Sequence, residues 1–214
     1  MPETVYTVNA YNNLKGPTPN LEKELLMFLW YIGNLESFRS MADRFGTSKG
    51  SFHSSITRVS SSLTSIMAEV IRWPTSQAEL NETSQTFGEN CQFQNVLGAL
   101  DGSHIPINAP KHQPQAYFNR KKFYSVVLLA CCNANMEFTY VWTGNPGSTH
   151  DATVLRMSDL FQNSDGKIPV GFVILGDSAF PLLQWLITPF RDCGNLTEQQ
   201  RKFNREHSRS KVSV

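Results

Sequence analysis

The sequence predicts an α/β fold: a mixed sheet of three antiparallel strands and a parallel fourth, packed with helices and preceded by an all-α region. Three observations support this fold class. Apolar residues recur at helical spacing from residue 20 to about residue 63. After residue 91, short runs rich in Val, Ile and Leu alternate with Gly, Pro and Asn breaks. A helical stretch separates the third of these runs from the fourth, and this order is typical of a layered α/β domain.

Composition places the chain among globular proteins and excludes a strongly basic surface. Its 214 residues are 40% hydrophobic and 17% charged, with a formal net charge of +1. Any surface that binds nucleic acid must therefore be a local patch. No apolar run approaches the roughly 20 residues that span a bilayer, and no secretory signal is visible. The four cysteines form no CxxC pair, which favours free thiols over structural zinc or a disulfide framework.

The first 90 residues divide into a polar lead-in and a helical region. Residues 1–19 contain glycine and prolines among polar residues, and we expect them to be disordered. Residues 20–90 are expected to be helical and to include a helix-turn-helix-like unit, with a short helix after Ser37, a glycine turn and a longer helix. In that unit Lys49 and Arg58 lie on the exposed face of the longer helix, where they can contact DNA. A plain three-helix packing unit explains the same pattern, so both interpretations stay open.

The composition changes at residue 91, and we expect a second domain over residues 91–214. Ser148 is expected to cap a helix, with Asp151 in the N3 position of a capping box. Thr197 is expected to cap a last, basic helix, with Gln200 in capping-box position. The expected strands span residues 96–105, 124–132, 138–143 and 171–176, and a short helix is expected at residues 181–187.

Two aspartates, Asp101 and Asp177, carry the functional hypothesis. Each follows a short apolar run and precedes small residues, which places both at strand ends. If the first and fourth strands are neighbours, the two carboxylates meet at one edge of the sheet. Carboxylate oxygens suit Mg²⁺ or Mn²⁺, and two such ions about 3.5–4 Å apart can cleave a phosphodiester. Taken singly, each aspartate is equally typical of a turn.

Three motifs support a resemblance to a known family. They are LDGSHI at residues 100–105, GNPGSTHD at residues 144–151 and GDSAFPLL at residues 176–183. Together they resemble the DDE endonuclease domain of PIF/Harbinger-type transposases and of the nuclease-like proteins derived from them. The resemblance implies an RNase H-like fold, an N-terminal helix-turn-helix region and divalent-metal DNA cleavage. It also implies a nuclear protein, with the cytoplasm as a second compartment, and a separate Myb-like partner protein.

Carried onto this sequence, the resemblance implies catalytic and metal-binding roles for Asp101 and Asp177. The third acid of the family is a glutamate that would come after Val214. We therefore expect the domain to be incomplete at its C-terminus and its activity to be impaired. Glu198 and Glu206 lie on the expected last helix, but neither matches the motif of that glutamate.

Other residues near the motifs are candidates for supporting roles. Asp151 and His150 could lie close to the metal ligands. His104, three positions after Asp101, lies on the opposite strand face and is more typical of a hydrogen-bonded structural histidine. A basic group follows two aromatic residues, a combination that favours contact with a nucleic-acid backbone. This group consists of Arg120, Lys121 and Lys122.

Three functions compete for these features. The leading hypothesis is a metal-dependent DNA endonuclease related to transposases. The alternative is a catalytically dead, domesticated or truncated protein that binds DNA or another protein. A metal hydrolase acting on small phosphate esters is a more distant third.

Overall fold

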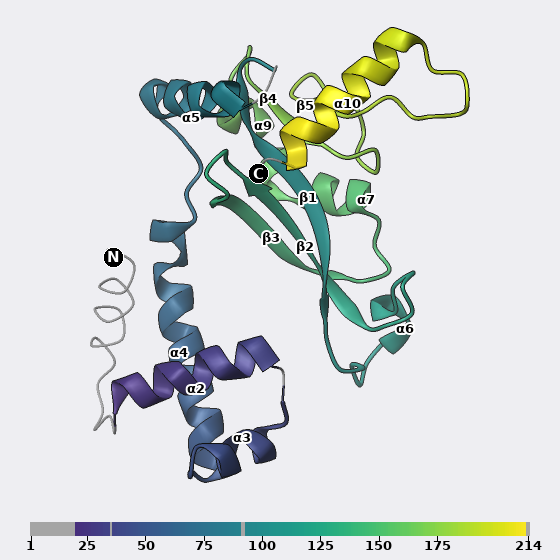
Figure 1. Cartoon of the computed structure of the whole chain (residues 1–214). Coiled ribbons are helices and arrows are strands. Elements are labelled where there is room, and N and C mark those ends of the chain that lie inside the picture. The colour runs from purple at the N-terminus through teal and green to yellow at the C-terminus, as the bar shows by residue number, and fades with distance from the viewer. Residues whose placement is uncertain (1–19, 35, 91–92, 213–214) are drawn as a thin grey trace. The chain divides into compact units, whose positions relative to one another are not determined.

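The protein is described by a computed structural model that covers residues 20–34, 36–90 and 93–212 (Figure 1). The expected lead-in at residues 1–19 and the expected domain boundary at Cys91 lie outside these described ranges. The chain forms two compact units that divide between Val70 and Ile71. Within the described ranges, no helix combines the length and the apolar character that crossing a membrane requires.

The first unit contains the helices α2 (Leu21–Asn34), α3 (Phe38–Arg44) and α4 (Lys49–Val70). The Ser37 hydroxyl caps α3 by accepting a hydrogen bond from the Ser40 N–H at 3.2 Å. Gly46 adopts a φ of 58° in the turn before α4, a conformation that glycine tolerates best. The three helices share one apolar cluster, so the short helix, turn and long helix occur where the sequence predicts them. The buried members of this cluster are Met27, Met41, Ala42, Phe52 and Ile56.

The second unit is built on the strands β1 (Val96–Pro106), β2 (Ser125–Cys132), β3 (Phe138–Pro146), β4 (Val173–Gly176) and β5 (Leu186–Ile187). They form a five-stranded sheet in the order β3-β2-β1-β4-β5. The β1–β2 and β2–β3 pairs are antiparallel, whereas the β1–β4 and β4–β5 pairs are parallel. The predicted mixed sheet is confirmed, with the first and fourth strands as neighbours and a fifth strand added at the edge.

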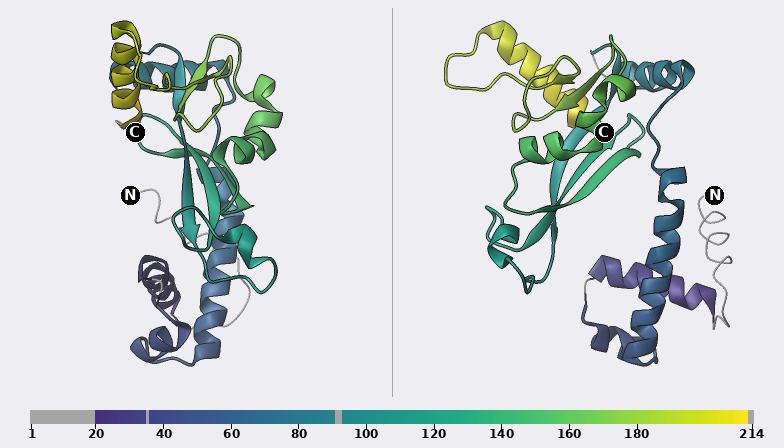
Figure 2. Two further views of the ribbon diagram at one scale, coloured as in Figure 1. Left: turned by 90° about the vertical axis from the view of Figure 1, so that its right-hand side faces the viewer. Right: turned by 180° about the vertical axis from the view of Figure 1, so that it is seen from behind.

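Helices cover both faces of this sheet. In the left view of Figure 2, α10 (yellow) lies on one side of the strands and the helices from α7 to α9 (green) lie on the other. On the α7 side, Leu100 and Ile174 pack against Leu155. Strand neighbours point to opposite faces, and Leu175 accordingly packs with Phe87 in a second cluster. The helices are α5 (Gln77–Asn90), α6 (Pro114–Tyr117), α7 (Asp151–Met157), α8 (Asp159–Gln162), α9 (Ser164–Lys167) and α10 (Glu198–Val212).

The expected helix at residues 181–187 is wrong. In the structure this segment forms a loop followed by β5, and Leu186 is the β4 partner of Ile174. The Ile174 N–H donates to the Trp185 carbonyl at 2.7 Å. The outer edge of β4 would otherwise present unpaired backbone groups, and the short strand satisfies them.

The segment just after residue 70 packs with the sheet. The Trp73 indole N–H donates to the Lys167 carbonyl at 2.7 Å, and its ring lies edge-on to Tyr140. On α5, Leu80 belongs to the larger apolar cluster and Phe87 to the smaller one. The sequence prediction groups this segment with the N-terminal helices because α5 is mostly polar. In the structure its few buried residues pack with the sheet instead.

Candidate active site

Asp101 and Asp177 lie at adjacent positions on neighbouring parallel strands. The register pairs Leu100 of β1 with Gly176 of β4, and one aspartate follows each of these two residues. The side chain of Asp101 is 67% exposed. Asp101 is one residue removed from Leu100, which packs on the α7 side, so alternation directs the Asp101 side chain to the α10 side. The first and fourth strands are neighbours as expected, but the expectation that Asp101 ends its strand is wrong, because β1 continues to Pro106 and stays paired with β2.

Local hydrogen bonds hold both carboxylates. Asp101 Oδ1 accepts from the Gly102 N–H at 2.9 Å, and Asp177 Oδ1 accepts from the Ala179 N–H at 2.9 Å. The second bond spans two residues and forms an Asx-type turn directly after β4. The small residues that follow each aspartate thus help to fix its carboxylate, and only those after Asp177 also follow the end of a strand.

Asp151 approaches the same strand from the α7 face. A Cβ on Gly102 would lie 2.7 Å from Asp151 Oδ1, so the carboxylate packs directly against this glycine and would have to shift for any larger residue. Burial raises the pKa of Asp151, and the charges of Asp177 and, more weakly, Asp101 raise it further. Three carboxylates from three separate motifs therefore lie close enough to interact electrostatically near the middle of β1.

The expected capping box at the start of α7 is wrong. α7 begins at Asp151, its N-cap residue is His150, and no side chain caps it. The Ser148 N–H instead donates to the Ala116 carbonyl at 3.0 Å, which keeps this segment in a turn against α6. Asp151 is thereby the first helical residue and is free to face Gly102.

His104 has a structural environment. Its Nδ1 lies 3.0 Å from the Ser125 hydroxyl, which also accepts a hydrogen bond from the Asn119 side-chain amide at 2.9 Å. Ser125 and Asn119 are both buried. Gly147 completes this packing, because a Cβ there would lie 2.1 Å from the Ser125 hydroxyl. Gly147, from the second motif, thus lets the end of β3 pack closely against the start of β2.

The basic loop lies beside the start of α7. The Arg120 guanidinium contacts both ring nitrogens of His150, 3.0 Å from Nδ1. Lys121 and Lys122 are exposed, and Lys122 has a φ of 67° in a tight turn. His150 directly precedes Asp151, so this contact brings the positively charged loop next to the carboxylates.

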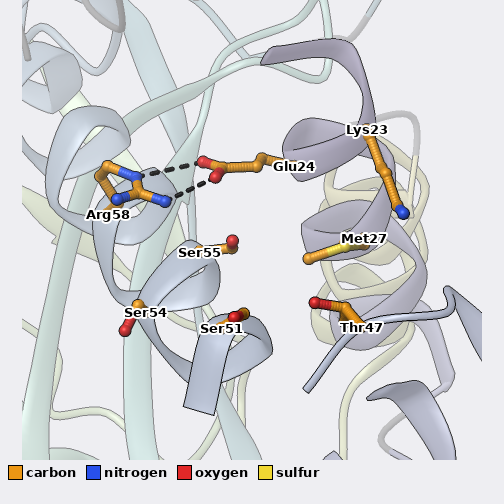
Figure 3. A pocket seen from close by; sticks show the side chains of 8 residues that line it. All are labelled: Lys23, Glu24, Met27, Thr47, Ser51, Ser54, Ser55 and Arg58. Carbon is orange, nitrogen blue, oxygen red and sulfur yellow. Dashed lines mark hydrogen bonds and ion pairs between the residues drawn. The ribbon is translucent and has the colours of Figure 1, made fainter. Parts of the chain in front are cut away.

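In the first unit, the two predicted DNA-contacting residues have different surroundings. Lys49 is exposed at the start of α4. Arg58 is held by an ion pair in which its Nε donates to Glu24 Oε2 at 3.1 Å, and Glu24 is buried. Figure 3 shows this pair at one end of a hydroxyl-rich cleft of about 460 Å³ between α2 and α4. Arg58 therefore stabilises the helical packing, and the pair limits its reach toward DNA.

α10 supplies two residues that the sequence prediction did not include in the site. Lys211 Nζ lies 3.4 Å from Asp101 Oδ1, and its side chain is only 18% exposed. His207 is buried, and its Nε2 lies 3.1 Å from the Ile187 carbonyl. Burial lowers the pKa of His207, and its hydrogen bond to the Ile187 carbonyl and, more weakly, the nearby Asp177 carboxylate partly oppose this shift. Their spacing of four residues places both side chains on one helix face, which is the signal that could have identified them.

The donor atoms are of the kind that a divalent cation prefers. Asp101 and Asp177 offer carboxylate oxygens, which suit Mg²⁺ and Mn²⁺. Within the part of the chain that the structure describes, no three His, Cys, Asp or Glu side chains gather closely enough to hold a metal ion. The carboxylates of Asp101 and Asp177 are thus chemically suited to a metal but form only part of a complete ligand set.

Comparison with known proteins decides the family. A family model described as "DDE superfamily endonuclease" matches residues 100–214, just over half of the chain. The chain belongs to this DDE endonuclease family. The matched residues include both aspartates and Asp151, and the family predicted from the three motifs is confirmed.

Curated relatives agree with this assignment. The chain is 29% identical over 187 residues to the rat (Rattus norvegicus) protein "Putative nuclease HARBI1", covering 87% of the chain and 53% of the relative. It is 28% identical over 201 residues to the human (Homo sapiens) protein of the same name, covering 92% and 57% respectively. It is also 28% identical over 215 residues to "Protein ALP1-like" of Arabidopsis thaliana, covering 92% and 52%. The chain thus spans about half the length of these relatives, and no solved structure matches it significantly.

Proposed function

We propose that the second unit is the core of a divalent-metal-dependent endonuclease that cleaves phosphodiester bonds in DNA. The observation that carries this proposal is the register of β1 and β4. It sets Asp101 and Asp177 at matching positions, each one residue past the last β1–β4 pair, with Asp101 midway along β1 and Asp177 directly after β4. Carboxylates that distant parts of the sequence place on neighbouring strands in this way can act together.

Each residue near this point has a role that follows from its surroundings. Asp101 and Asp177 would hold the cation, which when bound activates water and stabilises the leaving oxygen of the phosphodiester. Asp151 adds negative charge from the opposite face of β1 and has a raised pKa. The exposed Lys121 and Lys122 would meet DNA phosphates, because the Arg120–His150 contact brings their loop next to α7.

The first unit would bind DNA through the exposed face of α4, where Lys49 lies. Arg58 would contribute indirectly, by fixing α4 against α2 through Glu24. A nuclear location and a Myb-like partner protein are part of the same proposal, and both come from the family resemblance.

A cleavage assay on supercoiled plasmid DNA with Mn²⁺ or Mg²⁺ tests the proposal. We expect metal-dependent nicking that falls by about 100-fold or more in Asp101→Asn and Asp177→Asn, because each removes a cation ligand. Asp165→Asn is the matched control, since Asp165 is exposed on α9. Nicking that persists in both active-site variants rejects the assignment.

A second function is favoured by one observation: the Lys211 ammonium group pairs with Asp101. A carboxylate that is neutralised in this way suits a protein that binds DNA without cutting it. For that function we expect tight duplex binding that Mn²⁺ does not change, together with no nicking by the parent protein. This combination would replace the nuclease proposal.

A further inference from the structure

The helix α10 places one side chain near each of the two aspartates. The Lys211 ammonium lies 3.4 Å from Asp101 Oδ1. His207 lies one turn earlier on the same helix face, and the charge of Asp177 acts to raise its pKa. The side chain of Lys211 is mostly buried, whereas its partner Asp101 is 67% exposed. The helix therefore holds an ammonium group over the carboxylate at which the proposed cation would bind.

The positive charge of Lys211 offsets the repulsion among three neighbouring carboxylates. Asp101, Asp151 and Asp177 are close enough that the charges of the other two raise the pKa of Asp151. Like charges at such separations repel, and the repulsion is stronger near a protein surface than in bulk water. Among the described residues, Lys211 is the cation that forms an ion pair with one of these three carboxylates.

We propose that Lys211 is the counter-ion that neutralises Asp101 when no metal is bound, and that a divalent cation must displace it. This inference rests on the proposed function, because it concerns the same carboxylates. It goes further by making metal affinity a competition between the cation and the helix α10. A bound cation and the Lys211 ammonium cannot both occupy the same side of Asp101.

Mn²⁺ binding, followed by the electron paramagnetic resonance signal of free Mn²⁺, measures the competition. We expect Lys211→Met to bind Mn²⁺ about twofold to fivefold more tightly than the parent, the range set by a partly exposed ion pair. Lys211→Arg should keep the parent affinity. Arg209→Met is the matched control, because Arg209 lies on the same helix but pairs with Glu206.

A thermal double-mutant cycle without metal tests the counter-ion role by itself. Lys211→Met should lower the melting temperature in the parent background but have a smaller effect in Asp101→Asn, where the repulsion is already relieved. If Lys211 only packs α10 onto the sheet, Lys211→Met costs the same in both backgrounds, and the counter-ion role is overturned. Arg209→Met should behave identically in both.

The two measurements separate the inference from the proposed function. If the parent and Lys211→Met bind Mn²⁺ no better than the Asp101→Asn/Asp177→Asn double variant, the metal site fails. A coupling between Lys211 and Asp101 would then still support the counter-ion role. If Mn²⁺ binds through the aspartates but Lys211→Met does not tighten it, the competition is overturned and the metal site stands.

Discussion

At the scale of single residues, Asp151 has the most informative electrostatic surroundings. It is half-buried at the start of α7 and packs against a strand glycine. Burial and the charges of Asp177 and Asp101 raise its pKa above the usual 3.8. In the absence of metal, the ionised form of Asp151 therefore destabilises the folded state at neutral pH.

We predict that Asp151→Asn raises the melting temperature of the metal-free protein at pH 7, and that this gain disappears in acid. A raised pKa means that the folded state binds the proton more readily than the unfolded state. The parent thus regains stability as the pH falls through the raised pKa toward 3.8, and the two proteins converge below it. Melting curves from pH 3 to pH 8 would measure this difference.

Gly102→Ala provides an independent check on the same carboxylate. The added Cβ would lie 2.7 Å from Asp151 Oδ1, and a short side chain can turn away at little cost in stability. Turning away exposes the carboxylate to water, so Asp151→Asn in this background should give a smaller gain at pH 7. A pH-independent difference between parent and Asp151→Asn would contradict the explanation.

Much of the site could be predicted from these residues, for a clear reason. Asp101 and Asp177 each follow a short apolar run. The single assumption that the first and fourth strands are neighbours then places them close together. The sequence also places Asp151 among the candidates near the metal ligands, but its place as the first residue of α7 could not be predicted, because Ser148 and Asp151 have the spacing of a capping box and the structure uses neither in that way. The backbone bond from Ser148 to Ala116 joins distant segments and leaves no local signature.

At the scale of elements, α10 connects the sequence signal most directly to the site. Its predicted capping box is confirmed: the Gln200 N–H donates to the Thr197 hydroxyl at 3.2 Å, and the Thr197 N–H donates to Gln200 Oε1 at 2.9 Å. The two-residue strand β5 had no such signal, because two residues are too few to show alternation. The cap of a 15-residue helix is thus easier to predict than a two-residue edge strand.

We predict that Thr197→Ala lowers the free energy of unfolding by about 1 kcal/mol, because it removes one bond of the capping box and leaves backbone donors unsatisfied. Urea denaturation measures the change. Thr153→Ala on the exposed side of α7 is the control and should change stability little. Equal effects from the two substitutions would show that the cap does not contribute.

At the scale of the whole molecule, the extent of the second unit depends on a few buried residues before β1. Leu80 and Phe87 of α5 are 3% and 1% exposed, and the Trp73 indole N–H bonds to Lys167 at 2.7 Å. Composition alone predicts a domain start at residue 91, because most residues of α5 are polar. The few buried apolar side chains of this helix have little effect on its average composition. Packing depends on which side chains are buried, which composition does not report.

We predict that a fragment of residues 71–214 unfolds cooperatively, whereas residues 91–214 are far less stable. Full burial of a Leu or Phe side chain stabilises by about 1.5–3 kcal/mol. Losing Leu80 and Phe87 therefore removes about 3–6 kcal/mol from a total that is usually about 5–15 kcal/mol. Urea unfolding followed by near-ultraviolet circular dichroism compares the fragments, with Leu80→Ala in residues 71–214 as an intermediate case. If residues 91–214 unfold at the same urea concentration as residues 71–214, then α5 is a separate appendage and the unit begins at the strand-rich segment.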